Sequence, residues 1–143
     1  MIYTEKTKRA MQIACEAHYG QVDKSGFPYI FHPFHLAEQM DTEEECIVAL
    51  LHDTVEDTSV TIEQLEKEGF SSNVIQAIKL LTHDKSVDYL EYVRNLKNNP
   101  IARKVKLADL RHNSDPARGI KNPTERDKLR QQKYKKAIAI LND

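Results

Sequence analysis

The sequence is poor in several residue types, and each scarcity excludes a class of protein. It has no tryptophan and only two cysteines, four glycines and five prolines in 143 residues. Two cysteines are too few for the disulfide framework of a small secreted domain. Cys15 and Cys46 both fall in apolar helical patterns, so we expect reduced, buried thiols and a cytoplasmic protein. No apolar run approaches the length that spans a bilayer, and we expect no membrane association.

Neither sign of charge is in excess. Lys and Arg total 21 and Asp and Glu total 22, for a formal net charge of −1. A balanced charge does not drive binding to nucleic acid or to an anionic membrane, so we expect neither partner. Any attraction for an anionic ligand must be local. With 40% hydrophobic residues, the chain is long enough for one domain with a real core, covering residues 1–143.

Apolar residues recur at helical spacing, and no segment alternates as a strand does. We therefore predict an all-α bundle of about seven to eight helices. Pro33 suits the first position of a helix, which makes His32 its N-cap. Residues 20–29 lack helical periodicity and contain two glycines, which favours a ligand-facing loop. The other helices are expected over residues 4–19, 42–52, 61–69, 72–81, 88–97, 100–113 and 124–141.

The most informative segment is Leu-Leu-His-Asp-Thr-Val-Glu-Asp at residues 50–57, which places an imidazole and three carboxylates after an apolar stretch. Together with His32 upstream and Asp109 downstream, it forms a His…His-Asp…Asp set. Two neutral imidazoles and two carboxylates balance a 2+ charge and leave positions open for water. The pattern predicts one divalent metal ion at His32, His52, Asp53 and Asp109, and favours metal-dependent hydrolysis.

Three ordered motifs together resemble the hydrolase domain of RelA/SpoT-type alarmone enzymes, which belong to the HD phosphohydrolase superfamily. They are AHxGQxxKSGxPYIxHP at residues 17–33, ALLHDTVEDT at 49–58 and VKLADxxHN at 105–113. The resemblance extends from the first expected helix to about Asn113, and no synthetase region follows. The chain therefore looks like a small stand-alone alarmone hydrolase with an HD-type helical fold.

The resemblance implies Mn²⁺ as the metal and Glu56 and Asp57 as the acidic pair that acts on the attacking water. Glu56 would orient or deprotonate that water, and Asp57 would brace the site. The implied reaction removes the 3′-pyrophosphate from ppGpp or pppGpp and gives GDP or GTP. The expected substrate-binding residues are Lys24, Arg111, Asn113, Arg130 and Tyr134.

Two departures from the family keep other functions open. Asp23 stands where the family usually has an arginine that helps hold the guanine base, and Leu110 stands where it has a basic residue. An acid at residue 23 would repel phosphate. One alternative is therefore an HD-type phosphatase or nucleotidase acting on another nucleotide. A second is a metal-stabilised nucleotide sensor or interaction module without turnover, against which Glu56 and Asp57 argue.

Overall fold

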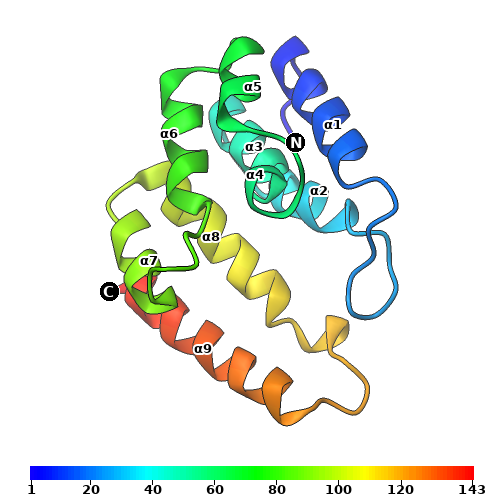
Figure 1. The fold of residues 1–143 in the computed structure, drawn as a ribbon, viewed down its shortest axis with the longest axis vertical. Coiled ribbons are helices and arrows are strands. Elements are labelled where there is room, and N and C mark those ends of the chain that lie inside the picture. The colour runs from blue at the N-terminus through cyan, green and yellow to red at the C-terminus, as the bar shows by residue number, and fades with distance from the viewer.

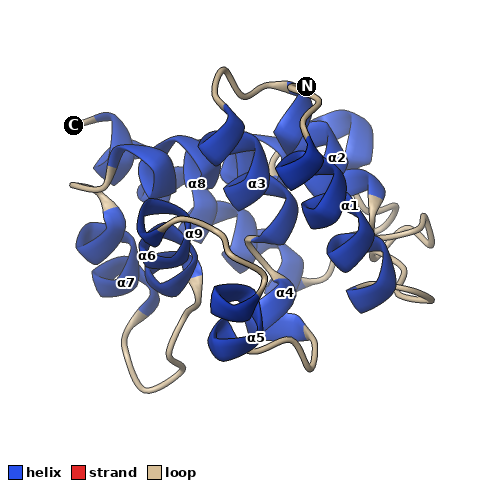
Figure 2. Cartoon of the chain, turned by 90° about the horizontal axis from the view of Figure 1, so that it is seen from above, coloured by secondary structure: helices blue, strands red, loops and turns tan.

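The computed structural model describes residues 1–143, and all of its regular elements are helices, which confirms the predicted fold class (Figure 2). The only strand-like pairing is an isolated antiparallel bridge between Val22 and Pro28. Eight of the helices are longer than one turn, as expected, and α4 is a single turn that the sequence pattern did not predict. None of them has the length and apolar character needed to cross a membrane. The elements are α1 (Glu5–Ala17), α2 (Phe31–Glu38), α3 (Glu43–Leu51), α4 (Thr54–Asp57), α5 (Ile62–Lys67), α6 (Ser72–Leu81), α7 (Tyr89–Leu96), α8 (Pro100–Asn113), the 3₁₀ helix η1 (Pro116–Arg118) and α9 (Glu125–Asn142).

Helix α3 is the centre of the bundle. It packs against α1, α2, α6 and α8, and every residue from Cys46 to Leu51 is buried (Figure 1). A helix covered on all sides must be apolar all round, which explains the uninterrupted run of apolar residues before His52. The end of this run therefore carries His52 into the protein interior.

The C-terminal part of the chain forms a second layer beside this centre. Helix α9 runs along α8 and α7, and η1 lies in the connection from α8 to α9 (Figure 1). The connection from α1 to α2 lies at the same end of the molecule, where Asp23 and Lys24 pair with Arg118 and Asp127. Two segments about 95 residues apart in the sequence therefore meet next to the ends of α2 and α8.

Most helix starts lie where local capping chemistry predicts them. The side chains of Thr42, Thr61 and Thr124 accept hydrogen bonds from backbone N–H groups in the first turns of α3, α5 and α9. Pro100 is the first residue of α8, preceded by Asn99 as the N-cap. These contacts satisfy N–H groups that have no partner within the helix.

Two expectations are wrong. Helix α2 begins at Phe31, so His32 lies inside its first turn and Pro33 is the third helical residue. Proline is tolerated there because the first-turn N–H groups have no intrahelical partner in any case. Cys15 is exposed, whereas Cys46 is buried as expected. The α1 stripe that faces the core is made instead by Ala10, Ile13 and Ala14.

The central position of α3 predicts a large cost for creating a cavity in it. Leu50→Ala should lower the free energy of unfolding by about 2–5 kcal/mol, because Leu50 is fully buried. Leu129→Ala is the matched control, since this leucine of α9 is 62% exposed, and it should change stability by about 0.5 kcal/mol or less. Urea denaturation of both variants measures the difference. Equal effects would contradict the central role of α3.

Candidate active site

Three of the four predicted metal ligands meet in the interior. His32 comes from the first turn of α2, His52 from the turn between α3 and α4, and Asp109 from α8. All three are buried, and their ligand atoms lie within 4.8 Å of one another. His32 Nε2 is 2.9 Å from Asp109 Oδ1, and His52 Nε2 is 3.7 Å from the same oxygen. This group could hold a metal ion.

Asp109 is a buried carboxylate that remains ionised because it is surrounded by donors. Burial alone would raise its pKa, but Lys106 and the two imidazoles outweigh burial and hold the pKa well below its usual range. Lys106 Nζ is 2.9 Å from Oδ2, and the amide of Asn113 donates to Oδ1 at 3.0 Å. The charged carboxylate is therefore ready to serve as a metal ligand.

His52 shows why the group needs a cation. Its Nδ1 lies 2.7 Å from the carbonyl oxygen of Ala49 and donates to it, so Nε2 of the neutral ring carries a lone pair. That Nε2 is buried without a hydrogen-bond partner and faces carboxylate oxygens of Asp53 at 3.0 Å and Asp109 at 3.7 Å. A nitrogen lone pair that faces two carboxylate oxygens at these distances is repelled by them unless a positive charge lies between the atoms. The four predicted ligands, called the donor set below, are His32, His52, Asp53 and Asp109. Their chemistry thus fits a divalent ion.

A proton is the alternative occupant of this position. Burial would lower the pKa of His52, but the adjacent charges of Asp53 and Asp109 raise it well above its ordinary value. A bound metal would displace that proton, so metal affinity should increase with pH.

His32 is fixed in the orientation that a metal ligand needs. Its Nδ1 is 2.7 Å from Nδ1 of His112, and the two rings are nearly coplanar, at 2°. Burial, reinforced by the charge of Arg118, lowers the pKa of His112 to about 4. His112 is therefore neutral and accepts the proton of His32 Nδ1, which leaves Nε2 of His32 free to coordinate.

The fourth predicted ligand, Asp53, lies beside this group and also accepts a hydrogen bond from Tyr29. Its Oδ2 contacts both His52 Nε2 and the Tyr29 hydroxyl. Burial, helped by the charge of Asp53, raises the pKa of Tyr29, which therefore remains a donor. Asp53 is ionised as well: burial opposes ionisation, but His52 outweighs it and lowers the pKa of Asp53 to about 2.

The two acidic residues of α4, Glu56 and Asp57, lie in different environments. Glu56 accepts a hydrogen bond from the backbone N–H of His83 at 2.7 Å and pairs with Lys85 Nζ at 3.2 Å. Asp57 has no such partner, and partial burial together with the charges of Asp53 and Glu56 raises its pKa to about 6. This pKa suits Asp57 to exchange a proton near neutral pH.

A cavity of about 890 Å³ adjoins the group. Tyr29 and Asn113 line it, and each donates a hydrogen bond to a carboxylate of the site, Asp53 and Asp109 respectively. Its wall carries five cationic side chains and three aspartates, so it favours an anionic ligand. The cavity therefore provides room for a nucleotide-sized molecule next to the buried donor set.

Four of the five predicted substrate-binding residues line the cavity. Its lining includes Lys24, Asn113, Arg130 and Tyr134. Arg111 is exposed and lies outside that lining, because the face of α8 that bears Asp109 and Asn113 points elsewhere. The structure therefore does not support a substrate contact for Arg111.

Four contributing residues were not predicted as site residues: Tyr29, Lys106, His112 and Arg118. Tyr29 and Lys106 stand inside the motifs, but their contacts with Asp53 and Asp109 are visible only in the fold. The position of Lys106 three residues before Asp109 on one helix was an available signal. Arg118 carries no comparable local signal.

The chain is similar in sequence to proteins named as ppGpp 3′-pyrophosphohydrolases. The chain is 40% identical over 91 residues to a guanosine-3′,5′-bis(diphosphate) 3′-pyrophosphohydrolase of Aquifex aeolicus, matching 61% of this chain and 13% of that protein. It is 38% identical over 116 residues to the zebrafish enzyme of that name, MESH1, matching 72% and 64%. The chain thus spans less than two thirds of these relatives. No protein-family model matches it.

A solved structure of a metazoan ortholog of SpoT that hydrolyses ppGpp has the same fold. The TM-score is 0.78 at 25% sequence identity, and the match covers 99% of this chain and 88% of that one. The relatives and this structure confirm the expected resemblance, and the structural match extends beyond Asn113, where the expected resemblance ended.

The contact between His32 and His112 generates a test of the metal site. His112→Ala should weaken Mn²⁺ binding by about 10- to 100-fold, because it removes the acceptor that orients a metal ligand. His35→Ala is the matched control, since His35 stacks on His112 without contacting the donor set. Isothermal titration calorimetry measures both affinities. An unchanged affinity in His112→Ala would show that His112 does not orient His32.

Proposed function

The chain is a relative of the RelA/SpoT-type ppGpp 3′-pyrophosphohydrolases, and we propose that it is a metal-dependent hydrolase of ppGpp and pppGpp. The reaction uses one water and gives GDP or GTP and pyrophosphate. The observation that carries the proposal is the buried His32, His52 and Asp109 group beside a cavity with an excess of cationic side chains.

The metal in this proposal is Mn²⁺, held by His32, His52 and Asp109 with Asp53 as the fourth ligand. When bound, a divalent ion polarises a phosphoryl oxygen and lowers the pKa of a bound water. Lys106 keeps the Asp109 carboxylate ionised, and Tyr29 holds the Asp53 carboxylate in place. Lys24, Arg130 and Tyr134 contact the nucleotide in the cavity.

The acidic pair acts on the attacking water in the proposed mechanism. The raised pKa of Asp57 supports Asp57 as the group that accepts the proton. The contacts of Glu56 with His83 and Lys85 support a role for Glu56 in fixing the position of α4 and the water. Compared with the roles that the family resemblance implies, proton acceptance moves from Glu56 to Asp57, whereas Glu56 keeps the orienting role.

The compartment in this proposal is a reducing cytoplasm. Both cysteines are free, and the exposed thiol of Cys15 would be prone to oxidation outside such a compartment.

A second candidate function is hydrolysis of another phosphorylated nucleotide. The feature that favours it is Asp23, an acid in the cavity wall where the family usually has an arginine. Both candidates use the same donor set and the same acidic pair, so only substrate preference separates them.

The direct test is turnover. The Mn²⁺-loaded protein, incubated with ppGpp, should release pyrophosphate and GDP, and chromatography of the products measures both. His52→Ala should lose both the metal and the activity, because it deletes a buried ligand. Faster turnover of another nucleotide would favour the second candidate. A metal-loaded protein that turns over none of a nucleotide panel would be a sensor.

The two acids can be separated by their pH profiles. Wild-type kcat/KM should fall as the pH drops through the pKa of Asp57, since a protonated carboxyl cannot accept a proton. Asp57→Asn should lower the rate by about 10²- to 10⁴-fold and remove this acid limb. Glu56→Gln should also lower the rate but retain the limb. If the limb disappears only in Glu56→Gln, Glu56 is the base.

A further inference from the structure

Arg118 is a cation of the cavity wall that hydrogen-bonds to a residue in contact with the buried donor set. Its Nη1 donates to the carbonyl oxygen of His112 at 3.1 Å and to the amide oxygen of Asn113 at 3.3 Å. The amide nitrogen of Asn113 in turn donates to Oδ1 of Asp109. Arg118 is therefore linked to the Asp109 carboxylate through a single side chain.

The contact with Asp23 holds this guanidinium from the other side. Oδ1 of Asp23 accepts the N–H groups of Ser25 and Phe27, at 2.9 and 3.0 Å, in the turn that contains Gly26 at a φ of +88°. Oδ2 lies 3.5 Å from Arg118 Nη2. Asp23 is therefore a turn-forming residue whose free oxygen is paired, and it does not present an isolated negative charge to a ligand.

Arg118 retains donors for a ligand. A guanidinium has five N–H groups in a planar fork, and the three contacts with protein atoms occupy at most three of them. The side chain is 26% exposed and lines the cavity. A fork that is fixed by protein contacts and still has free donors is suited to a phosphate group.

The other cations nearby have a different arrangement. Lys24 and Arg130 both pair with Asp127 on α9, at 3.6 and 3.0 Å, and neither forms a hydrogen bond or ion pair with Asn113 or with the donor set. Lys128 pairs with Glu125 at 3.4 Å. Of the five cavity cations, Arg118 is the one that hydrogen-bonds to Asn113, which contacts Asp109, so it is well placed to bind a phosphate beside the metal group.

We propose that Arg118 is a substrate-specificity residue that binds a phosphate of the nucleotide, and that Asp23 positions it. The inference rests on the proposed function of the same site. In this proposal the cation that binds the ligand, Arg118, belongs to η1. The family's usual arginine belongs instead to the loop of residues 20–29, at the position of Asp23. The acid at residue 23 then supports binding of an anionic nucleotide instead of opposing it.

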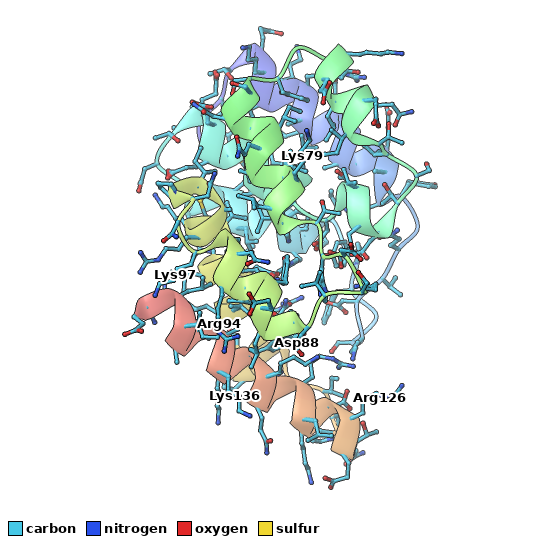
Figure 3. The ribbon with its side chains drawn as sticks, turned by 60° about the vertical axis from the view of Figure 1, so that its left-hand side comes forward. Lys79, Asp88, Arg94, Lys97, Arg126 and Lys136 are labelled. Atoms are coloured by element: carbon cyan, nitrogen blue, oxygen red, sulfur yellow. The ribbon has the colours of Figure 1, made fainter.

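The test compares Arg118→Gln with Arg126→Gln. Arg126 is exposed at the N-terminal end of α9, outside the cavity lining (Figure 3), so its loss changes the net charge equally without removing a ligand contact. Arg118→Gln should raise the KM for ppGpp by about 10- to 100-fold, as expected for one charge-assisted hydrogen bond. The kcat should change less, because the contact is present in ground and transition states alike. Arg126→Gln should change KM by about twofold or less.

Three further measurements separate binding from a structural role. Arg118→Lys, which keeps the charge but loses the fork, should give an intermediate KM. The KM of Arg118→Gln should depend less steeply on salt than that of wild type, since one charge contact is gone. The Mn²⁺ affinity of Arg118→Gln should be unchanged. An altered Mn²⁺ affinity with wild-type nucleotide affinity would overturn the inference, because Arg118 would then act only through Asn113 or His112.

Binding of ppGpp to the metal-free protein, measured by calorimetry, tests the role of Arg118 separately from the proposed hydrolase activity. If wild type releases no pyrophosphate, the proposed function fails, and the binding measurement still decides the role of Arg118. Weaker binding by Arg118→Gln than by Arg126→Gln supports that role. Equal binding by the two variants, or no binding by wild type, overturns it.

Discussion

The structure depends on keeping Asp109 ionised in the protein interior. A buried carboxylate is energetically costly unless positive charge or hydrogen-bond donors surround it; here α2, α8 and the turn between α3 and α4 supply them. Lys106 contributes a full charge from within α8 and lies above the rings of Tyr89 and Tyr92, at 5.7 and 5.4 Å. Although burial would lower the pKa of Lys106, Asp109 raises it well above its usual value. Each charge of this pair therefore keeps the other ionised.

Lys106 neutralises only part of the negative charge in the site. Asp53 is ionised as well, and Nε2 of His52 faces both carboxylates without a hydrogen-bond partner. This remaining negative charge draws a proton to His52, which explains the direction of its pKa, and would bind a divalent ion in place of the proton. The two histidine ligands are oriented by residues outside the donor set. The carbonyl oxygen of Ala49 contacts Nδ1 of His52, and Nδ1 of His112 contacts Nδ1 of His32.

The parts of the fold that the sequence predicts are those determined by neighbouring residues. Helix starts at Thr61, Pro100 and Thr124 follow from side chains that bond to N–H groups within the same turn. The start of α2 was misplaced because Pro33 is compatible with more than one position in a first turn. The buried His and Asp residues were predictable because charged or polar residues within an apolar run require a partner.

The cavity could not be derived in the same way, because its wall is made by tertiary contacts. Asp23 and Arg118 are far apart in the sequence, and nothing around either residue indicates that they pair. Arg111 was predicted to bind substrate from its place in a motif, but it is exposed on α8. The sequence thus predicts which chemistry the site can perform, whereas substrate recognition depends on how the loop of residues 20–29, η1 and α9 come together.

The central claim is that the unbalanced negative charge of the buried group binds one divalent ion. Crystals of the protein grown with Mn²⁺ test it directly through anomalous scattering at the manganese edge. The account predicts a single strong peak in contact with Nε2 of His32, Nε2 of His52 and Oδ1 of Asp109. No peak at this position, or a peak confined to surface carboxylates, would contradict it.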